Sequence, residues 1–75
     1  ELALDGGEDG LDVYRRLLGA APHMLLPGGM FCVELYEGHL NKAARLAEEQ
    51  GVWESVEFKE DLTHRPRILV ARLAK

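Results

Sequence analysis

The sequence predicts an α/β fold in which a helix, a strand, a second helix and two further strands follow one another. Three observations predict it: apolar residues at helical spacing after Leu11, an almost uncharged run at Met30–Leu35, and strict alternation at Ser55–Lys59. Steps of three and four are typical of a helix that buries one side, and alternation is typical of a half-exposed strand. A short continuous apolar run indicates a strand covered on both faces. We therefore expect helices above and below a sheet.

The first helix starts near Leu11 and carries one apolar side. Its members follow steps of three and four along the chain: Leu11, Tyr14, Leu18, Ala21 and Leu25. Pro22 interrupts this pattern, because proline has no N–H to donate and its ring clashes with the carbonyl four residues back. We expect a kink or a break near residues 20–22.

The strand at Met30–Leu35 follows the turn Pro27-Gly28-Gly29. Cys32 lies inside this run, and a lone cysteine there is expected to be a buried small hydrophobe. Glu34 is the only charged residue of the run and stands near the carboxyl end of the strand. Open α/β sheets bind their ligands at that end. Glu34 either lines a cleft there or pairs with a cation such as Arg65 or Arg67, and the residues alone leave both roles open.

The sequence pattern of the second half of the chain predicts a helix followed by an edge strand and a central strand. Residues 39–50 have apolar residues on one side, and Gly51 suits the position that ends a helix. Ser55–Lys59 carries charges on one face, as edge strands do. Ile68–Leu73 is mostly apolar and suits a central position. We therefore place the last strand between the other two and antiparallel to both.

Composition excludes several classes of protein. The chain has 75 residues and a net charge of −4, which does not suit a nucleic-acid binder with its basic face. No apolar run approaches the roughly 20 residues that a membrane-spanning helix needs. The histidines and the one cysteine are isolated from one another in sequence, so no metal-binding pattern is present. A single thiol suits a reducing compartment, and we expect a cytoplasmic protein.

An acidic, glycine-rich run precedes the first helix. It comprises Asp5, Gly6, Gly7, Glu8, Asp9 and Gly10. Glycines permit positive φ and close approach of a backbone to a ligand. The run is either a solvated loop leading into the helix or a loop that binds a substrate or partner.

Several motifs of the chain occur together in one order. They are Ala3-Leu4-Asp5-Gly6-Gly7-Glu8-Asp9-Gly10-Leu11-Asp12, Leu26-Pro27-Gly28-Gly29, Glu34, and Asp61-Leu62 with Arg65 and Arg67. This order resembles the carboxyl-terminal part of the HemK-type glutamine methyltransferases, which modify peptide-chain release factors. The resemblance covers nearly all of the chain. Leu-Pro-Gly-Gly is common to many methyltransferases, whereas the acidic-glycine run combined with Asp-Leu-x-x-Arg-x-Arg is more specific.

The resemblance implies that residues 1–75 are the carboxyl-terminal portion of a class I, Rossmann-like methyltransferase fold. The family transfers a methyl group from S-adenosylmethionine to a glutamine side-chain nitrogen of a release factor. Its glycine-rich cofactor loop and its Asn-Pro-Pro-Tyr motif lie upstream and do not occur here. The resemblance therefore implies no catalytic and no cofactor-binding residue in this chain, which alone would be inactive. It places the Asp5–Gly10 loop and Glu34 beside the substrate site.

Two departures from the family pattern leave other functions open. Tyr36 stands where the family often has glycine, and His39 follows where glutamine is usual. A methyltransferase with another acceptor is therefore one alternative. A non-catalytic domain whose acidic loop engages a basic partner is another. The strand at Met30–Leu35 also predicts a homodimer, because an unpaired apolar edge can pair with a second chain.

Overall fold

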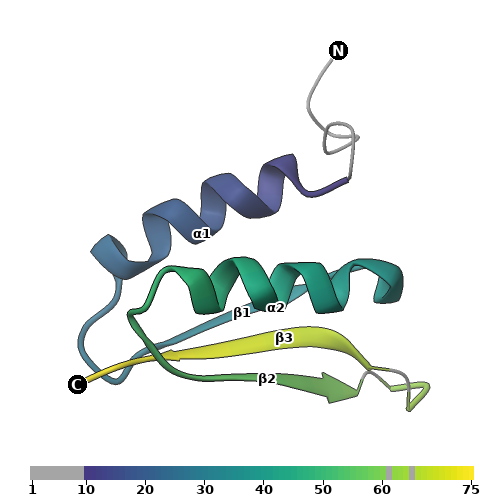
Figure 1. Cartoon of the computed structure of the whole chain (residues 1–75). Coiled ribbons are helices and arrows are strands. Elements are labelled where there is room, and N and C mark those ends of the chain that lie inside the picture. Colours follow the sequence, from purple (N-terminus) through teal and green to yellow (C-terminus); the bar gives the residue numbers. More distant parts are fainter. Residues whose placement is uncertain (1–9, 61, 65) are drawn as a thin grey trace.

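The computed structural model describes residues 10–60, 62–64 and 66–75 and forms two layers (Figure 1). The elements are α1 (Asp12–Met24), β1 (Met30–Glu34), the 3₁₀ turn η2 (Glu37–His39), α2 (Leu40–Glu49), β2 (Trp53–Glu60) and β3 (Pro66–Leu73). Both helices lie on the same side of one three-stranded sheet. The expected order of helix, strand, helix, strand and strand is confirmed.

The sheet has the order β1-β3-β2, and both pairings are antiparallel. Val33 faces Leu69 in the first pairing, and Phe58 faces Leu69 in the second. The predicted central place of the last strand and the edge place of the strand before it are confirmed. Because β1 and β2 both run antiparallel to β3, they run parallel to each other and their carboxyl ends lie at the same end of the sheet.

The helix α1 buries the predicted side, with Tyr14, Leu18 and Ala21 in the core. A kink or a break was expected at residues 20–22, and the break is wrong, because the helix runs through Pro22 to Met24. Pro22 cannot donate to the carbonyl of Leu18. The side-chain amide of Gln50 donates to that oxygen instead, over 3.1 Å. A residue distant in sequence thus supplies the hydrogen bond that proline removes.

The second helix also follows its prediction. Leu40, Ala43 and Ala47 are buried, and Gly51 adopts a φ of 70° directly after the helix. The small alanines let α2 approach the sheet closely, and Ala43 and Ala47 have no exposed surface. A row of aromatic rings completes the core. Tyr14 of α1 stacks near Phe31 of β1 at 6.3 Å between centroids, and Phe31 stacks near Trp53 of β2 at 6.1 Å.

The helices cover only one face of the sheet, so the expected cover on both faces of β1 is wrong for the described residues. Phe31 and Val33 pack against the core, whereas Met30, Cys32 and Glu34 are exposed on the other face. Cys32 is therefore an exposed thiol and not the buried hydrophobe expected from sequence. An apolar run shows that both faces of a strand tolerate burial, but it does not show what packs against the second face.

Candidate functional site

The carboxyl ends of β1 and β2 border a hollow of about 490 Å³. Glu34 ends β1 and Glu60 ends β2, and both line the hollow together with Leu62, Thr63 and Ile68. Glu34 lies opposite Ile68 in the β1–β3 register. The position is the one that open sheets use for ligands, at the carboxyl ends of parallel strands. Sequence reasoning found Glu34 but missed Glu60, although Glu60 also stands where a charged strand reaches its end.

The side chain of Glu34 is exposed and points to the uncovered face of the sheet. Arg67 belongs to the other face, because it precedes Ile68 by one residue and successive strand side chains alternate. The β1–β3 ladder nevertheless joins the two segments, since the N–H of Leu35 donates to the carbonyl of Arg67 over 2.8 Å. Glu34 forms no ion pair with any described residue. Its other expected partner, Arg65, lies outside the described residues.

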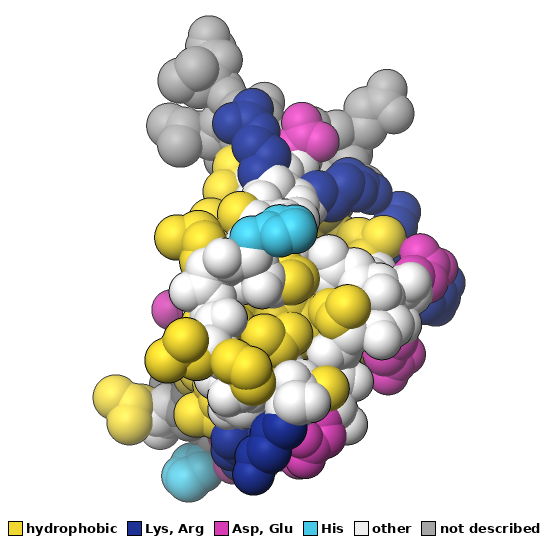
Figure 2. Space-filling model, turned by 90° about the vertical axis from the view of Figure 1, so that its left-hand side faces the viewer, with side chains coloured by type: hydrophobic (Ala, Val, Ile, Leu, Met, Phe, Trp, Pro, Cys, Tyr) yellow, Lys and Arg dark blue, Asp and Glu magenta, His cyan; other side chains and the backbone are white. Residues whose placement is uncertain are grey.

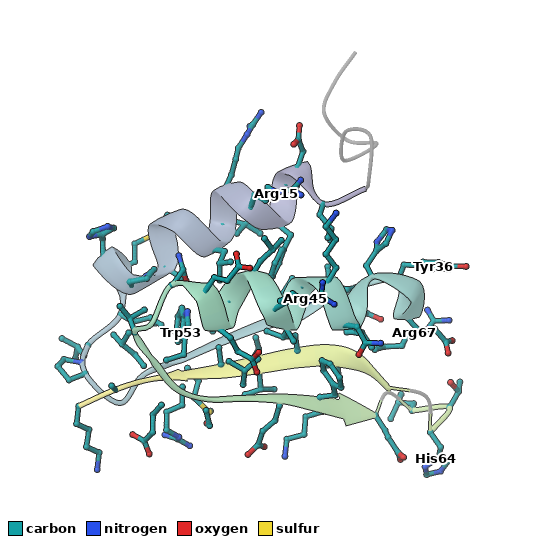
Figure 3. All side chains as sticks on the ribbon, viewed as in Figure 1. Arg15, Tyr36, Arg45, Trp53, His64 and Arg67 are labelled. Carbon is teal, nitrogen blue, oxygen red and sulfur yellow. The ribbon has the colours of Figure 1, made fainter. Side chains whose placement is uncertain are left out.

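Tyr36 and His39, the two departures from the family pattern, meet directly after β1. Their rings contact edge to face, with 5.4 Å between centroids and 69° between planes. Tyr36 remains exposed at this end of the molecule, where Figure 3 also shows Arg67. The two side chains therefore form one aromatic feature of the surface near the carboxyl end of β1.

Gly10 brings the end of the acidic-glycine run to the same place. It adopts a φ of 76°, and a Cβ added there would lie 2.5 Å from Cε1 of His39. Only glycine fits both the positive φ and this close contact. The rest of the run, Asp5–Asp9, lies outside the described residues. The structure thus brings the last residue of the run, the Tyr36–His39 pair and the end of β1 to one end of the fold.

The segment between β2 and β3 borders the hollow from the other side. His64 adopts a φ of 63°, and its Nδ1 lies 3.3 Å from Oε1 of Glu60 in an exposed pair. Leu62 is 99% exposed. A contact this exposed contributes little to stability. The surface around the hollow therefore has carboxylates, one imidazole and one fully exposed leucine.

The described ranges offer neither a metal-binding cluster nor a membrane-spanning helix. No group of three or more His, Cys, Asp or Glu side chains there could hold a metal ion. No helix among the described residues has the length and the apolar character to cross a membrane.

The sequence of this chain is similar to those of several known proteins. The chain is 44% identical over 70 residues to a release factor glutamine methyltransferase of Rhodospirillum rubrum, covering 93% of this chain and 21% of that protein. The protein of the same name in Streptomyces coelicolor is 39% identical over 74 residues, covering 99% of this chain and 26% of its own. The release factor glutamine methyltransferase of Clostridium acetobutylicum is 36% identical over 70 residues, covering 93% of this chain and 24% of that protein. No family model and no solved structure matches.

The chain is similar to release factor glutamine methyltransferases. The resemblance to the HemK-type family is therefore confirmed over nearly the whole chain. The chain spans about a fifth to a quarter of the length of the curated methyltransferases it matches, between 21% and 26%. The strand order agrees with the fold that the resemblance implied, in which the last strand is antiparallel between its two neighbours.

The cofactor of such methyltransferases does not fit the described residues by themselves. A nucleotide cofactor is usually held by a glycine-rich turn between a strand and a helix. Gly28 and Gly29 precede a strand instead, and His39 occupies the space beside Gly10. The described part of the chain therefore offers no cradle for S-adenosylmethionine.

Proposed function

We propose that the chain is the carboxyl-terminal portion of an S-adenosylmethionine-dependent methyltransferase that methylates a glutamine side chain of peptide-chain release factors. The observation that carries the proposal is identity of 36–44% to proteins of that name over 93–99% of this chain. The order β1-β3-β2 supports it, because it agrees with the end of a class I, Rossmann-like methyltransferase sheet. A cytoplasmic location fits the single cysteine of the chain.

In this proposal the chain contributes one wall of the substrate site. The carboxyl ends of β1 and β2 carry Glu34 and Glu60 at the hollow. Gly10 holds the end of the acidic loop Asp5–Gly10 against His39, next to the end of β1. A wall of this kind orients an acceptor side chain, and correct orientation lowers the barrier of a transfer reaction. The cofactor and the groups that contact the reacting atoms would come from another part of the protein.

The full-length protein encoded by the parent gene provides the test. We expect it to transfer a labelled methyl group from S-adenosylmethionine to a purified release factor. We expect Glu34→Gln to reduce kcat by more than about tenfold, at a cost in melting temperature of no more than a few degrees. The matched control is Glu57→Gln, an exposed carboxylate on the same sheet face but on β2.

Two outcomes would count against the proposed role of Glu34. One is a melting temperature that collapses while the remaining folded enzyme turns over normally, which would indicate a structural carboxylate. The other is an equal loss of turnover in Glu57→Gln. Absence of methyl transfer to any release factor would favour the alternative acceptors or the non-catalytic interaction domain. In that case a glycine-rich loop and an Asn-Pro-Pro-Tyr motif upstream of Glu1 would distinguish another methyltransferase from a binding domain.

A further inference from the structure

Tyr36 follows the carboxyl end of β1 by two residues, and its backbone is held on both sides. The N–H of Leu35 donates to the carbonyl of Arg67 over 2.8 Å, which ties the residue before Tyr36 to β3. The carbonyl of Tyr36 accepts from the N–H of His39 over 2.8 Å, which closes η2. These two hydrogen bonds fix the point from which the side chain of Tyr36 starts.

The ring of Tyr36 lies against Gly38 and His39. A Cβ added to Gly38 would lie 2.9 Å from Cε2 of Tyr36, so the ring occupies space that only glycine leaves open. The imidazole of His39 contacts the same ring edge to face, with 5.4 Å between centroids. Aromatic pairs in this geometry attract each other beyond the effect of their burial. The two neighbours therefore fix the direction in which the ring points.

His39 is itself held in place by the start of the first helix. A Cβ added to Gly10 would lie 2.5 Å from Cε1 and 2.9 Å from Nε2 of His39, so the imidazole packs directly on the Gly10 backbone. The next residue, Leu11, has no exposed surface and belongs to the core. The support of Tyr36 thus leads through His39 and Gly10 back to the core of the fold.

The supported ring points out of the fold at the end of the sheet where open sheets bind their ligands. Figure 3 shows the hydroxyl of Tyr36 directed away from the helices and the sheet. Glu34, two residues earlier, borders the hollow at the proposed substrate site. A tyrosine supplies a large contact area at a small loss of side-chain freedom, and its hydroxyl can bond a peptide group. A ring that is already fixed in direction loses still less freedom when it binds.

We propose that Tyr36 is a specificity-determining residue that contacts the peptide segment carrying the acceptor glutamine, and that Gly38 and His39 are positioning residues for its ring. This inference rests on the proposed function, because it needs a protein acceptor at the end of β1. A contact that is equally strong before and during methyl transfer strengthens binding of the acceptor without speeding the chemical step. Its loss raises the KM for the release factor, whereas the loss of Glu34 lowers kcat.

Steady-state kinetics of the full-length protein test the contact of Tyr36 with the acceptor. We expect Tyr36→Ala to raise the KM for the release factor about tenfold, because the ring supplies most of the contact. Tyr36→Phe keeps the ring and loses only the hydroxyl, so its KM should stay within about threefold of that of the unchanged protein. Both variants should keep the kcat and the KM for S-adenosylmethionine of the unchanged protein.

The matched control is Leu26→Ala, which truncates an exposed side chain away from the proposed contact. Leu26 is 81% exposed and lies in the turn between α1 and β1, at the opposite end of β1 from Tyr36. Figure 2 faces that end of the molecule and shows hydrophobic side chains gathered across it. We expect this variant to leave the KM for the release factor unchanged. An equal rise of the KM in the control would overturn the inference.

A pair of glycines tests the positioning without removing the ring. Gly38→Ala places a Cβ in the space of the ring, which must then leave its present direction. We expect the KM for the release factor to rise about fivefold, because a freed ring must be ordered again on binding. Gly19→Ala makes the same change in α1, where an added Cβ meets no described atom within 4 Å, and should leave this KM unchanged.

Double variants separate positioning from a merely structural role. Gly38→Ala and His39→Ala should each raise the KM for the release factor in the unchanged background. Neither should raise it further in the Tyr36→Ala background, because both act through the ring. An equal rise in the two backgrounds would overturn the positioning roles.

The outcomes distinguish this inference from the proposed function on which it rests. Methyl transfer by Tyr36→Ala with an unchanged KM for the release factor overturns the inference and leaves the proposed function standing. A lower melting temperature of this variant, with that KM unchanged, also overturns it, because the ring would then pack against another part of the protein. Absence of methyl transfer by the unchanged protein overturns the proposed function, and the inference falls with it.

Discussion

At the residue scale, Tyr14 links the two helices. It is 3% exposed, and its hydroxyl donates to the carbonyl of Ala43 over 2.7 Å. Burial raises the pKa of Tyr14 to about 12, because the phenolate would lose its hydration in the core. Sequence reasoning placed Tyr14 on the buried side of α1, but the partner carbonyl is 29 residues away along the chain and has no signature in the sequence.

This pKa predicts how stability depends on alkaline pH. The unfolded chain ionises Tyr14 near the ordinary value of 10.0, whereas the folded chain keeps it neutral up to about 12. The stability from Tyr14 is therefore complete below pH 10 and is lost as the pH rises toward 12, by about 2–3 kcal/mol in all. Tyr14→Phe should lack this loss and cost about 1 kcal/mol at neutral pH. Urea unfolding at several pH values measures both effects, and an unchanged pH dependence in Tyr14→Phe would contradict the assignment.

At the element scale, Gln50 holds α1, α2 and β2 together. Its side-chain nitrogen donates to the carbonyl of Leu18, and its side-chain oxygen accepts from the indole N–H of Trp53 over 2.6 Å. The first bond satisfies the carbonyl that Pro22 leaves without its helical donor. The second satisfies a half-buried indole. One amide therefore compensates for a proline within a helix and fixes the start of the adjacent strand.

A double-mutant cycle tests this compensation. We expect Gln50→Ala to lower the free energy of unfolding by about 1–3 kcal/mol, because it leaves two polar groups without partners. In a Pro22→Ala background the same change should cost less, since the alanine N–H can then donate to Leu18. Chemical unfolding of the four proteins gives the coupling energy. Glu49→Ala, at an exposed neighbouring position, serves as the control. If Gln50→Ala lowers the free energy of unfolding equally in both backgrounds, Gln50 does not compensate for Pro22, and its contribution comes from the hydrogen bond to Trp53 alone.

At the scale of the whole molecule, the described residues form a thin slab. Its principal extents are 35 × 30 × 18 Å, which suits a sheet with one layer of helices. The uncovered face carries Met30, Cys32 and Glu34 on β1 and continues onto Arg72 of β3. The hollow at the carboxyl ends opens on the side of the sheet to which Glu34 points. The proposed wall of the substrate site therefore lies on a surface that the two helices leave open.

This architecture predicts the behaviour of the isolated chain toward the cofactor. We expect the 75-residue chain neither to bind S-adenosylmethionine measurably nor to methylate a release factor, because its described glycines form no cofactor cradle. Calorimetric titration of the chain measures the binding, with the full-length protein as the positive control. Micromolar binding by the chain alone would contradict the expectation and would place a cofactor site within these residues.

The sequence by itself determined the elements and their order. Spacing of three and four residues placed α1 and α2, because a helix that packs on a core must bury one side. The alternation at Ser55–Lys59 and the apolar run at Ile68–Leu73 placed the edge and the centre of the sheet. The motifs from Asp5 to Arg67 identified the family resemblance. Each of these features is a local pattern or a set of short motifs. Such features can be recognised in the sequence without knowing which distant segments come into contact.

Only the tertiary structure decided what depends on contacts between distant segments. An apolar run cannot show whether its second face is covered, so the exposure of Cys32 was missed. The continuation of α1 through Pro22 depends on Gln50, which lies 32 residues from the carbonyl it satisfies. The contact of Gly10 with His39 depends on how the start of α1 packs near η2. Glu34 and Glu60 meet at one hollow because β3 lies between β1 and β2. Local residue preferences determine elements, whereas partners and open surfaces follow from how those elements pack.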